Sequence, residues 1–166
     1  MRVMPIREID VLIPLADGER LHHEVLSALL AQDVICHVLP ISRPRSDSAK
    51  GRKSQTECRN LLRVRAAGRY ALMMDSDVVL SRPTDVSEMA RYLDENPVYG
   101  AVGLRTKRHV TSHVIISCVC VRSEILRATP FHNDNDRCNC IGFTNAITTC
   151  YLDDRILQEI DRRDTE

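Results

Sequence analysis

The sequence predicts an α/β domain in which a mostly parallel sheet lies between layers of helices. Short apolar runs alternate with amphipathic stretches along most of the chain, and this alternation of strands and helices is typical of layered α/β folds. A chain of 166 residues with 43% hydrophobic residues is long enough for one domain with a sizeable core. We therefore expect residues 1–166 to form a single three-layer α/β/α sandwich.

Five apolar runs predict the strands of this sheet. Alternation along the last of them places four side chains on one face: Val114, Ile116, Cys118 and Cys120. The runs span residues 10–15, 34–41, 70–75, 98–104 and 113–121.

Amphipathic stretches and capping residues predict the helices. The capping box of Ser54 and Glu57 should start a helix that runs to Ala67, before Gly68. Thr84 is suited to cap the next helix. The helix of residues 123–128 is short, residues 130–150 have no regular pattern, and residues 151–163 suit a closing helix. The residues with helical spacing are Leu21, Val25, Leu29 and Gln32, then Val86, Met89, Ala90 and Leu93, and finally Ile156, Leu157 and Ile160.

The balance of charges excludes partners that bind through the net charge of the protein. The 23 basic and 23 acidic residues leave no net charge to attract nucleic acid or an anionic membrane. No apolar run approaches the roughly 20 residues of a membrane span, and the N-terminal residues lack the apolar region of a signal peptide. Seven cysteines, an odd number, fit a reducing compartment. We expect a soluble, cytoplasmic protein.

Two aspartates separated by one residue, Asp75 and Asp77, follow the third predicted strand. In α/β sheets ligands bind at the carboxyl ends of the strands, and paired carboxylates there can hold a hard cation such as Mg²⁺ or Mn²⁺. Aspartates are also ordinary turn residues at strand ends. The spacing alone leaves a metal site and a polar turn equally open.

The context of these aspartates resembles the family 2 type glycosyltransferases. Their opening strand, which ends in proline, and its helix are similar to "DVLIPLADGERLHHEVLSALLAQD", with Ser27 and Gln32 at matching places. A second similar stretch is "ECRNLLRVRAAGRYALMMDSDVVL", which contains the family's Asp-x-Asp motif near its end. Its matching residues are Arg59, Asn60, Ala67, Gly68, Tyr70, Asp75 and Asp77. The resemblance implies a minimal GT-A fold, with residues 1–96 binding the nucleotide sugar and residues 97–166 the acceptor.

The resemblance also implies roles for individual residues. Asp75 and Asp77 would hold Mn²⁺ or Mg²⁺ on the diphosphate of a UDP- or GDP-type sugar donor. Asp154, with its neighbour Asp153, would act as the base on the hydroxyl of an unidentified acceptor; the alternative is that both only complement a helix dipole. The other residues implied at the donor site are Pro14, Asp17, Ser42, Asp47, Arg59 and Asn60.

Two departures from the family pattern refine these expectations. The acidic residue that usually follows the second strand and recognises the base is replaced by Ser42, so Asp47 or Asp17 would have to substitute; Asp17 also suits a helix N-cap. The Gln-x-x-Arg-Trp motif of processive synthases is missing, since the chain contains no Trp. The resemblance therefore implies a non-processive, inverting transfer, by a monomer or a homo-oligomer.

Further groups of residues leave alternatives open. Cys118, Cys120, Cys138 and Cys140 have the residue types of a zinc site but not its usual spacing, and a disulfide in this region is an alternative. Buried core thiols are the simpler account of Cys118 and Cys120. Two basic groups suit either a lid over a diphosphate or a solvated surface: Arg43, Arg45, Lys50, Arg52 and Lys53, and Arg105, Lys107 and Arg108. A phosphohydrolase of the haloacid-dehalogenase type and a non-catalytic binding module are the rival functions.

Overall fold

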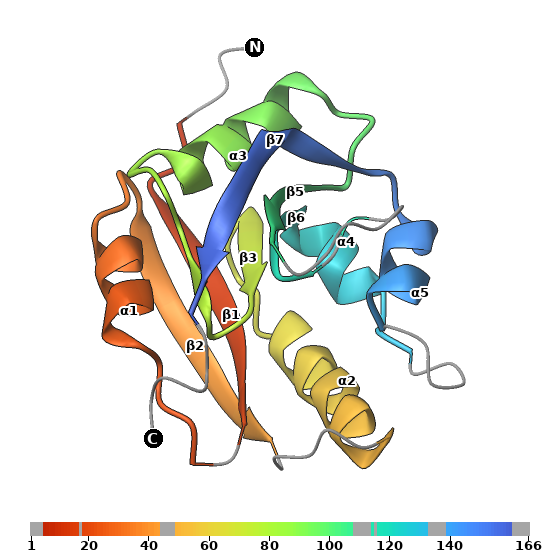
Figure 1. Ribbon diagram of the computed structural model, residues 1–166. Coiled ribbons are helices and arrows are strands. Elements are labelled where there is room, and N and C mark those ends of the chain that lie inside the picture. Colours follow the sequence, from red (N-terminus) through yellow and green to blue (C-terminus); the bar gives the residue numbers. More distant parts are fainter. Residues whose placement is uncertain are drawn as a thin grey trace.

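The computed structural model describes residues 5–16, 18–43, 49–107, 114, 116–132 and 139–160. In this part of the chain the strands form one sheet in the order β2-β1-β3-β6-β5-β7-β4 (Figure 1). The strands are β1 Glu8–Ala16, β2 Ile35–Arg43, β3 Tyr70–Met74, β4 Val78–Val79, β5 Ala101–Thr106, β6 Cys118–Arg122 and β7 Thr149–Glu159. The helices are α1 His23–Leu30, α2 Ala49–Arg63, α3 Asp85–Glu95, α4 Ser123–Ala128 and α5 Asn139–Ala146.

The sheet is mixed rather than mostly parallel. β1 pairs in parallel with β2 and β3, and β5 pairs in parallel with β7. β6 lies between β3 and β5 and is antiparallel to both, and β4 is antiparallel to β7. The expectation of a mostly parallel sheet is wrong because apolar runs predict strands but not the direction in which distant strands pair.

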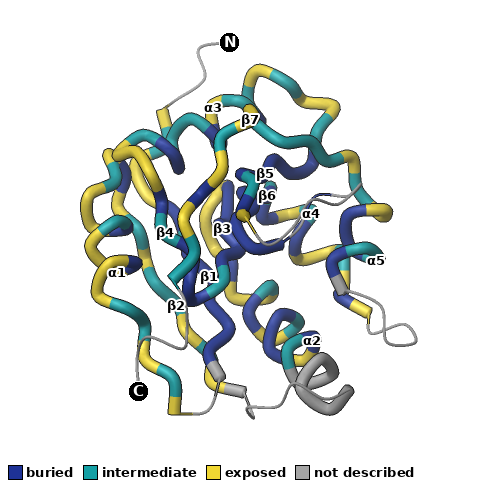
Figure 2. The backbone as a smooth tube through the Cα atoms, in the orientation of Figure 1, coloured by how far each residue is buried: buried dark blue, intermediate teal, exposed yellow. Residues whose placement is uncertain are grey.

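Helices cover both faces of the sheet, and each face has its own apolar core. The first core contains side chains of α1 and α3, such as Val25 and Met89, and the second contains side chains of α2, α4 and α5, such as Leu62, Leu126 and Phe143. Successive residues of a strand point to opposite faces, and accordingly Leu72 lies in the first core and Met73 in the second. Figure 2 shows the buried central strands between exposed helix surfaces.

The C-terminal segment differs most from the predicted elements. Residues 149–159 form β7, not a helix. Leu157 is fully buried and the adjacent Ile156 is 56% exposed, as alternation across a strand requires. The helical spacing of Ile156, Leu157 and Ile160 is overridden because β5 and β4 each offer β7 a strand edge for pairing.

Other elements also differ from the predictions. α2 begins at Ala49, before the capping box at Ser54, and ends at Arg63 rather than Ala67. β6 begins only at Cys118, so Val114 and Ile116 pack in the second core while Cys118 and Cys120 lie in the first. α5 forms within residues 130–150, where no regular element is expected.

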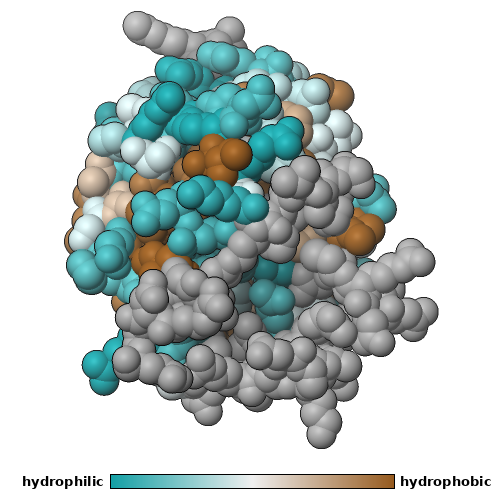
Figure 3. Space-filling model, in the orientation of Figure 1, coloured by the Kyte–Doolittle hydropathy of each residue, from teal (hydrophilic) through white to brown (hydrophobic). Residues whose placement is uncertain are grey.

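The described surface shows no dominant apolar region in the view of Figure 3, where separate apolar patches lie in a mostly hydrophilic surface. Leu30, Val98 and Ile156 are among the exposed apolar side chains. Single exposed residues of this kind are normal for a folded domain. No helix among the described residues is long and apolar enough to cross a membrane.

Candidate active site

The segment Asp75-Ser76-Asp77 forms a tight turn directly after β3. The backbone N–H of Val78 donates to the carbonyl of Asp75 at 3.3 Å, and β4 begins at Val78. Because β1, β2 and β3 are parallel, their carboxyl ends meet at this edge of the sheet. The sequence-based placement of the motif at a strand end is confirmed, and it is also a turn.

The carboxylate of Asp75 is held from two sides. A guanidinium nitrogen of Arg59 lies 3.2 Å from Oδ1, and the hydroxyl of Ser117 donates to Oδ2 at 3.0 Å. The backbone N–H of Asp75 also donates to the carbonyl of Ser117 at 3.0 Å. The Arg59 side chain is only 3% exposed, whereas that of Asp75 is 24% exposed. These contacts fix the rotamer of Asp75 and leave part of its carboxylate open to a ligand.

Ser76 and Asp77 are buried next to the C-terminal strand. Ser76 is 1% exposed and its hydroxyl donates to the carboxylate of Glu19. Asp77 is 2% exposed, and its carbonyl accepts the backbone N–H of Ile160 at 2.8 Å. The end of β7 is thus tied to the motif, through Ile160 and through the pairing with β4.

The donor set of this turn fits a hard divalent cation. Carboxylate oxygens are ligands that Mg²⁺ and Mn²⁺ prefer, and Mg²⁺ in nucleotide sites takes one or two protein carboxylates while phosphates and water complete its shell. Asp75 contributes a partly exposed carboxylate to this turn and Asp77 a buried one. Within the described part of the chain, no three His, Cys, Asp or Glu side chains are grouped as a metal site.

Asn60 connects two elements in this structure. Its Nδ2 donates to the carbonyl of Phe131 at 2.8 Å, and its Oδ1 accepts the backbone N–H of Phe131 at 2.9 Å. Oδ1 also accepts a hydrogen bond from Nε of Arg63 at 3.0 Å. The amide therefore links α2 to the segment that follows α4.

The remaining residues implied at the donor site lie along the same edge or outside the described residues. Leu12 pairs with Met73, so the register continued by two residues places Pro14 beside Asp75. Pro14 is buried, and Ser42, which pairs with Leu15, is exposed. Asp17 and Asp47 lie outside the described residues.

Asp153 and Asp154 lie in a bulge of β7 and not at a helix N-terminus. Gly103 pairs with Tyr151 and Arg105 pairs with Ile156, so two steps along β5 face five steps along β7. Bulges of this kind redirect side chains and are frequent beside active sites. Both aspartates are exposed. The helix-dipole interpretation of this acidic pair is therefore wrong.

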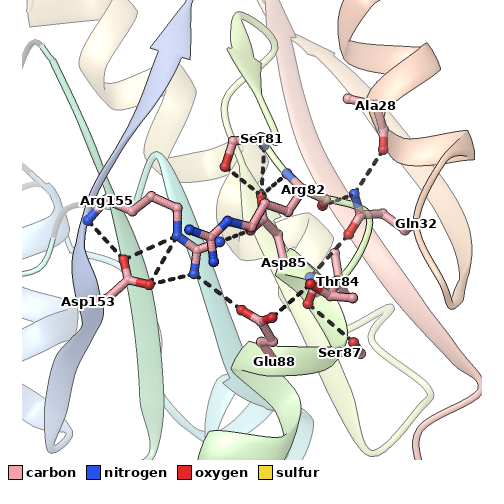
Figure 4. Close-up of polar contacts among 11 residues, drawn as sticks. Ala28, Gln32, Ser81, Arg82, Thr84, Asp85, Ser87, Glu88, Asp153 and Arg155 are labelled. Atoms are coloured by element: carbon pink, nitrogen blue, oxygen red, sulfur yellow. Dashed lines mark hydrogen bonds and ion pairs between the residues drawn. The ribbon is translucent and has the colours of Figure 1, made fainter.

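Arg155, at the end of the bulge, forms an ionic network that sequence reasoning missed (Figure 4). Its guanidinium pairs with Asp85, with Glu88 at 3.2 Å and with Asp153. Asp85 is fully buried, and its other oxygen accepts the backbone N–H groups of Ser81 and Arg82 at 2.7 and 2.9 Å. Only the tertiary structure shows this link between β7 and the start of α3.

Hydrogen bonds in the network lower the pKa of two of its carboxylates, those of Asp153 and Glu88. Hydrogen bonds from Arg155 lower the pKa of Asp153. The pKa of Glu88 is lowered chiefly by the hydroxyl of Thr84, which donates to Glu88 instead of capping α3, and further by Arg155. The carboxylates of Asp85, Glu88 and Asp153 thus all lie beside the permanently charged guanidinium of Arg155.

The cysteines proposed as zinc ligands are not brought together. Cys118 and Cys120 are fully buried in the first core and Cys140 is buried in the second, on the opposite face of the sheet. Burial raises the pKa of both strand thiols, which opposes formation of the thiolate that zinc requires. The structure favours the core interpretation for Cys118 and Cys120 and shows that Cys140 is a core residue as well, which the sequence did not predict. Cys138 lies outside the described residues.

The sequence matches no protein-family model and no curated protein. Solved structures are similar to it in three dimensions. S. aureus TarS 1–349 has a TM-score of 0.66 at 16% identity over 92% of this chain and 59% of that one. The mannosyltransferase PcManGT from Pyrobaculum calidifontis, solved with GDP-Man and Mn²⁺, has a TM-score of 0.61 at 13% identity over 97% of this chain and 60% of that one.

A third similar structure comes from Mycobacterium tuberculosis. Glucosyl-3-phosphoglycerate synthase, solved with Mn²⁺, UDP-glucose and glycerol 3-phosphate, has a TM-score of 0.59 at 13% identity, over 94% of this chain and 73% of that one. This chain has the GT-A fold of the nucleotide-diphospho-sugar transferases. It spans about three fifths of the length of TarS 1–349 and of PcManGT. On the GT-A fold, the Asp75 turn lies at the carboxyl end of a strand, where ligands bind α/β sheets.

Proposed function

We propose that this protein transfers a sugar from a nucleotide-diphosphate sugar to an acceptor hydroxyl, with Mn²⁺ or Mg²⁺ held by Asp75 and Asp77. The observation that carries the proposal is the position of Asp75, anchored by Arg59 and Ser117 at the carboxyl end of β3 in a GT-A fold. The solved structures of PcManGT and of the M. tuberculosis synthase, which share this fold, contain Mn²⁺ and a nucleotide sugar, and they support the same donor class here.

The residues at this edge of the sheet would each have a separate role in the transfer. A divalent ion bound there would stabilise the negative charge that develops on the leaving diphosphate. Arg59 and Ser117 keep Asp75 oriented, so that no conformational search is needed when the donor binds. Pro14 and Ser42 lie at the same edge, on the strands that would flank the nucleotide.

Asp154 is the residue we propose as the base for an inverting, non-processive transfer. An acceptor hydroxyl becomes a good nucleophile only when a positioned group takes its proton. Asp153 is engaged by Arg155, whereas Asp154 lies exposed on the bulge of β7. The division into a donor half, residues 1–96, and an acceptor half, residues 97–166, follows from these roles.

Calorimetric titration of UDP and GDP tests the metal assignment. With Mn²⁺ present, we expect one of the two nucleotides to bind the wild type, and Asp75→Asn and Asp77→Asn each to weaken that binding at least tenfold while the circular dichroism spectrum stays unchanged. Glu24→Gln, which removes an exposed carboxylate on α1, is the control and should bind like the wild type. Unchanged affinity in both aspartate variants would refute the metal site.

Product analysis separates transfer from the two rival functions. Release of phosphate from a phosphomonoester, with no hydrolysis of or transfer from a nucleotide sugar, would favour the phosphohydrolase. Nucleotide binding that survives the aspartate substitutions, without turnover, would favour the non-catalytic module.

A further inference from the structure

Arg105, near the end of β5, has a guanidinium group without a carboxylate partner among the described residues. Its Nε atom is buried and has no hydrogen-bond partner in that part of the chain. The guanidinium carbon lies 4.3 Å from the centroid of the Tyr151 ring. Leaving a buried donor without a partner is unfavourable, so a partner from outside the chain would recover part of that cost.

Other arginines that stack on rings in this protein have protein partners. Arg59, over Phe131, pairs with Asp75, and Arg69, over Tyr70, pairs with Asp94. Neither aspartate of the β7 bulge neutralises Arg105. Asp153 is bound to Arg155, and in the described part of the chain no ion pair joins Asp154 to Arg105. Among the described residues, Arg105 therefore differs from Arg59 and Arg69 in having no carboxylate partner. It also differs from Arg122, over Tyr70, which donates to two backbone carbonyls.

The strand register places Arg105 close to the candidate active site. Met74 of β3 pairs with Cys118, and Gly103 of β5 pairs with Val119. Continued by one position on β3 and by two positions on β5, these registers place both Asp75 and Arg105 beside Ser117. Two strand spacings of about 4.8 Å then separate the two backbones by roughly 10 Å. Residues opposite one another in antiparallel pairs point to the same face, so both side chains lie on the face of the second core.

The stacked arrangement makes Arg105 a prepared oxyanion binder. Tyr151 holds the plane of the guanidinium, and a planar fork of N–H donors matches a phosphate or carboxylate group. Arg105 is part of β5 rather than of a basic lid, so its backbone is fixed by the sheet. The bulge that carries Asp154 lies between the β5 partners Gly103 and Arg105. Arg105 and this bulge are therefore neighbours along the β5–β7 pair.

We propose that Arg105 binds a phosphate or carboxylate group of a substrate at this site. The inference rests on the proposed function, and the anion can belong to the acceptor or to the donor. Inorganic phosphate is the probe, because it carries the shared chemistry and contains neither a nucleotide nor a sugar.

The first arm of the test uses phosphate alone. In ¹⁵N-labelled protein, the buried Nε–H of Arg105 should give its own NMR signal and shift saturably on addition of phosphate. Arg105→Gln should weaken phosphate binding at least tenfold. Arg69→Gln is the matched control, since it removes an arginine that is stacked on tyrosine but paired, and it should bind phosphate like the wild type.

The outcomes of this arm decide the proposal. The absence of a saturable shift in the wild type, or an affinity within twofold of the wild type in Arg105→Gln, would overturn it. Arg105→Lys, which keeps the charge but loses the planar fork, should give an intermediate affinity. If Arg105→Gln does not fold, the signal of the wild-type Nε–H and the Lys variant still give the answer.

The second arm identifies the source of the anion. With Mn²⁺ and UDP or GDP at saturation, unchanged phosphate affinity assigns Arg105 to the acceptor. Displacement of phosphate by the nucleotide, together with weaker nucleotide binding in Arg105→Gln, assigns it to the diphosphate of the donor. Because the first arm needs no nucleotide, failure of the proposed function would leave the phosphate result intact, and the two failures can be distinguished.

Discussion

Arg155 of β7 forms an ion pair with the fully buried carboxylate of Asp85, the first residue of α3. The two residues are 70 positions apart in the sequence. Through this pair the bulge that carries Asp153 and Asp154 is fastened to the loop between β4 and α3, where Asp85 also binds the backbone of Ser81 and Arg82. The position of the proposed base is therefore set by a contact between two distant segments.

Asp85→Ala should lower the free energy of unfolding by about 3 kcal/mol or more, because it leaves the Arg155 cation without its buried partner and removes the acceptor for two backbone N–H groups. Asp153→Ala removes a carboxylate that is 40% exposed on the same guanidinium and should cost less than about 1 kcal/mol. Urea unfolding of both variants measures the difference. Equal losses of unfolding free energy in the two variants would show that burial of Asp85 does not determine how much the network contributes to stability.

Asn60→Ala should destabilise the protein by about 2 kcal/mol, because two backbone groups of the buried Phe131 lose their partners. Leu61→Ala, on the same helix at a 58% exposed position, is the control and should change stability by less than about 0.5 kcal/mol. The same samples are titrated with Mn²⁺ and nucleotide. Lost affinity with unchanged stability would instead indicate that Asn60 contacts the donor directly.

Gly103→Ala should destabilise by about 1–3 kcal/mol, since the added Cβ would lie 2.8 Å from Cγ1 of Val114. Gly142→Ala provides the contrast, because nothing lies within 4 Å of its added Cβ and alanine is favoured over glycine in a helix such as α5. We expect that variant to be as stable as the wild type or more stable by up to about 1 kcal/mol. Thermal unfolding of the two variants checks this ranking. A Gly103→Ala protein as stable as the wild type would contradict it.

Tyr70→Phe should make stability less sensitive to alkaline pH. Burial and then the hydrogen bond to Asp94 raise the pKa of Tyr70 from 10.0 to about 12. Between these values the unfolded chain releases the phenolic proton and the native protein retains it, so the stability contributed by Tyr70 is complete below pH 10 and is lost as pH rises towards 12.

Denaturant unfolding at several pH values between 9 and 11.5 measures this effect as the difference between wild type and variant. The buried thiols of Cys118 and Cys120 titrate in both proteins, so their contribution cancels in the difference. The gap between the two stabilities should narrow as pH rises. A gap that stays constant would mean that the native environment does not hold the proton on Tyr70.

Apart from the two-residue strand β4, the sequence by itself determined the order of strands and helices up to Leu93, and it determined the position of Asp75 and Asp77 after a buried strand. These features depend on local properties, namely the apolar period of each segment and the turn residues that end it. The strong periods at Val25 and Leu29, and at Val86, Met89 and Leu93, all correspond to buried helix faces.

Only the tertiary structure decided the direction of β6, the strand conformation of residues 149–159 and the partners of Arg155, Asn60 and Arg105. Each depends on groups far apart along the chain: β7 gains its hydrogen bonds from β5 and β4, and Asn60 meets Phe131, which lies 71 residues away. Local spacing at Ile156 and Leu157 favours a helix, but pairing with open strand edges and burial of Leu157 stabilise a strand more. The residue pattern within a segment does not show which strand edge that segment will pair with.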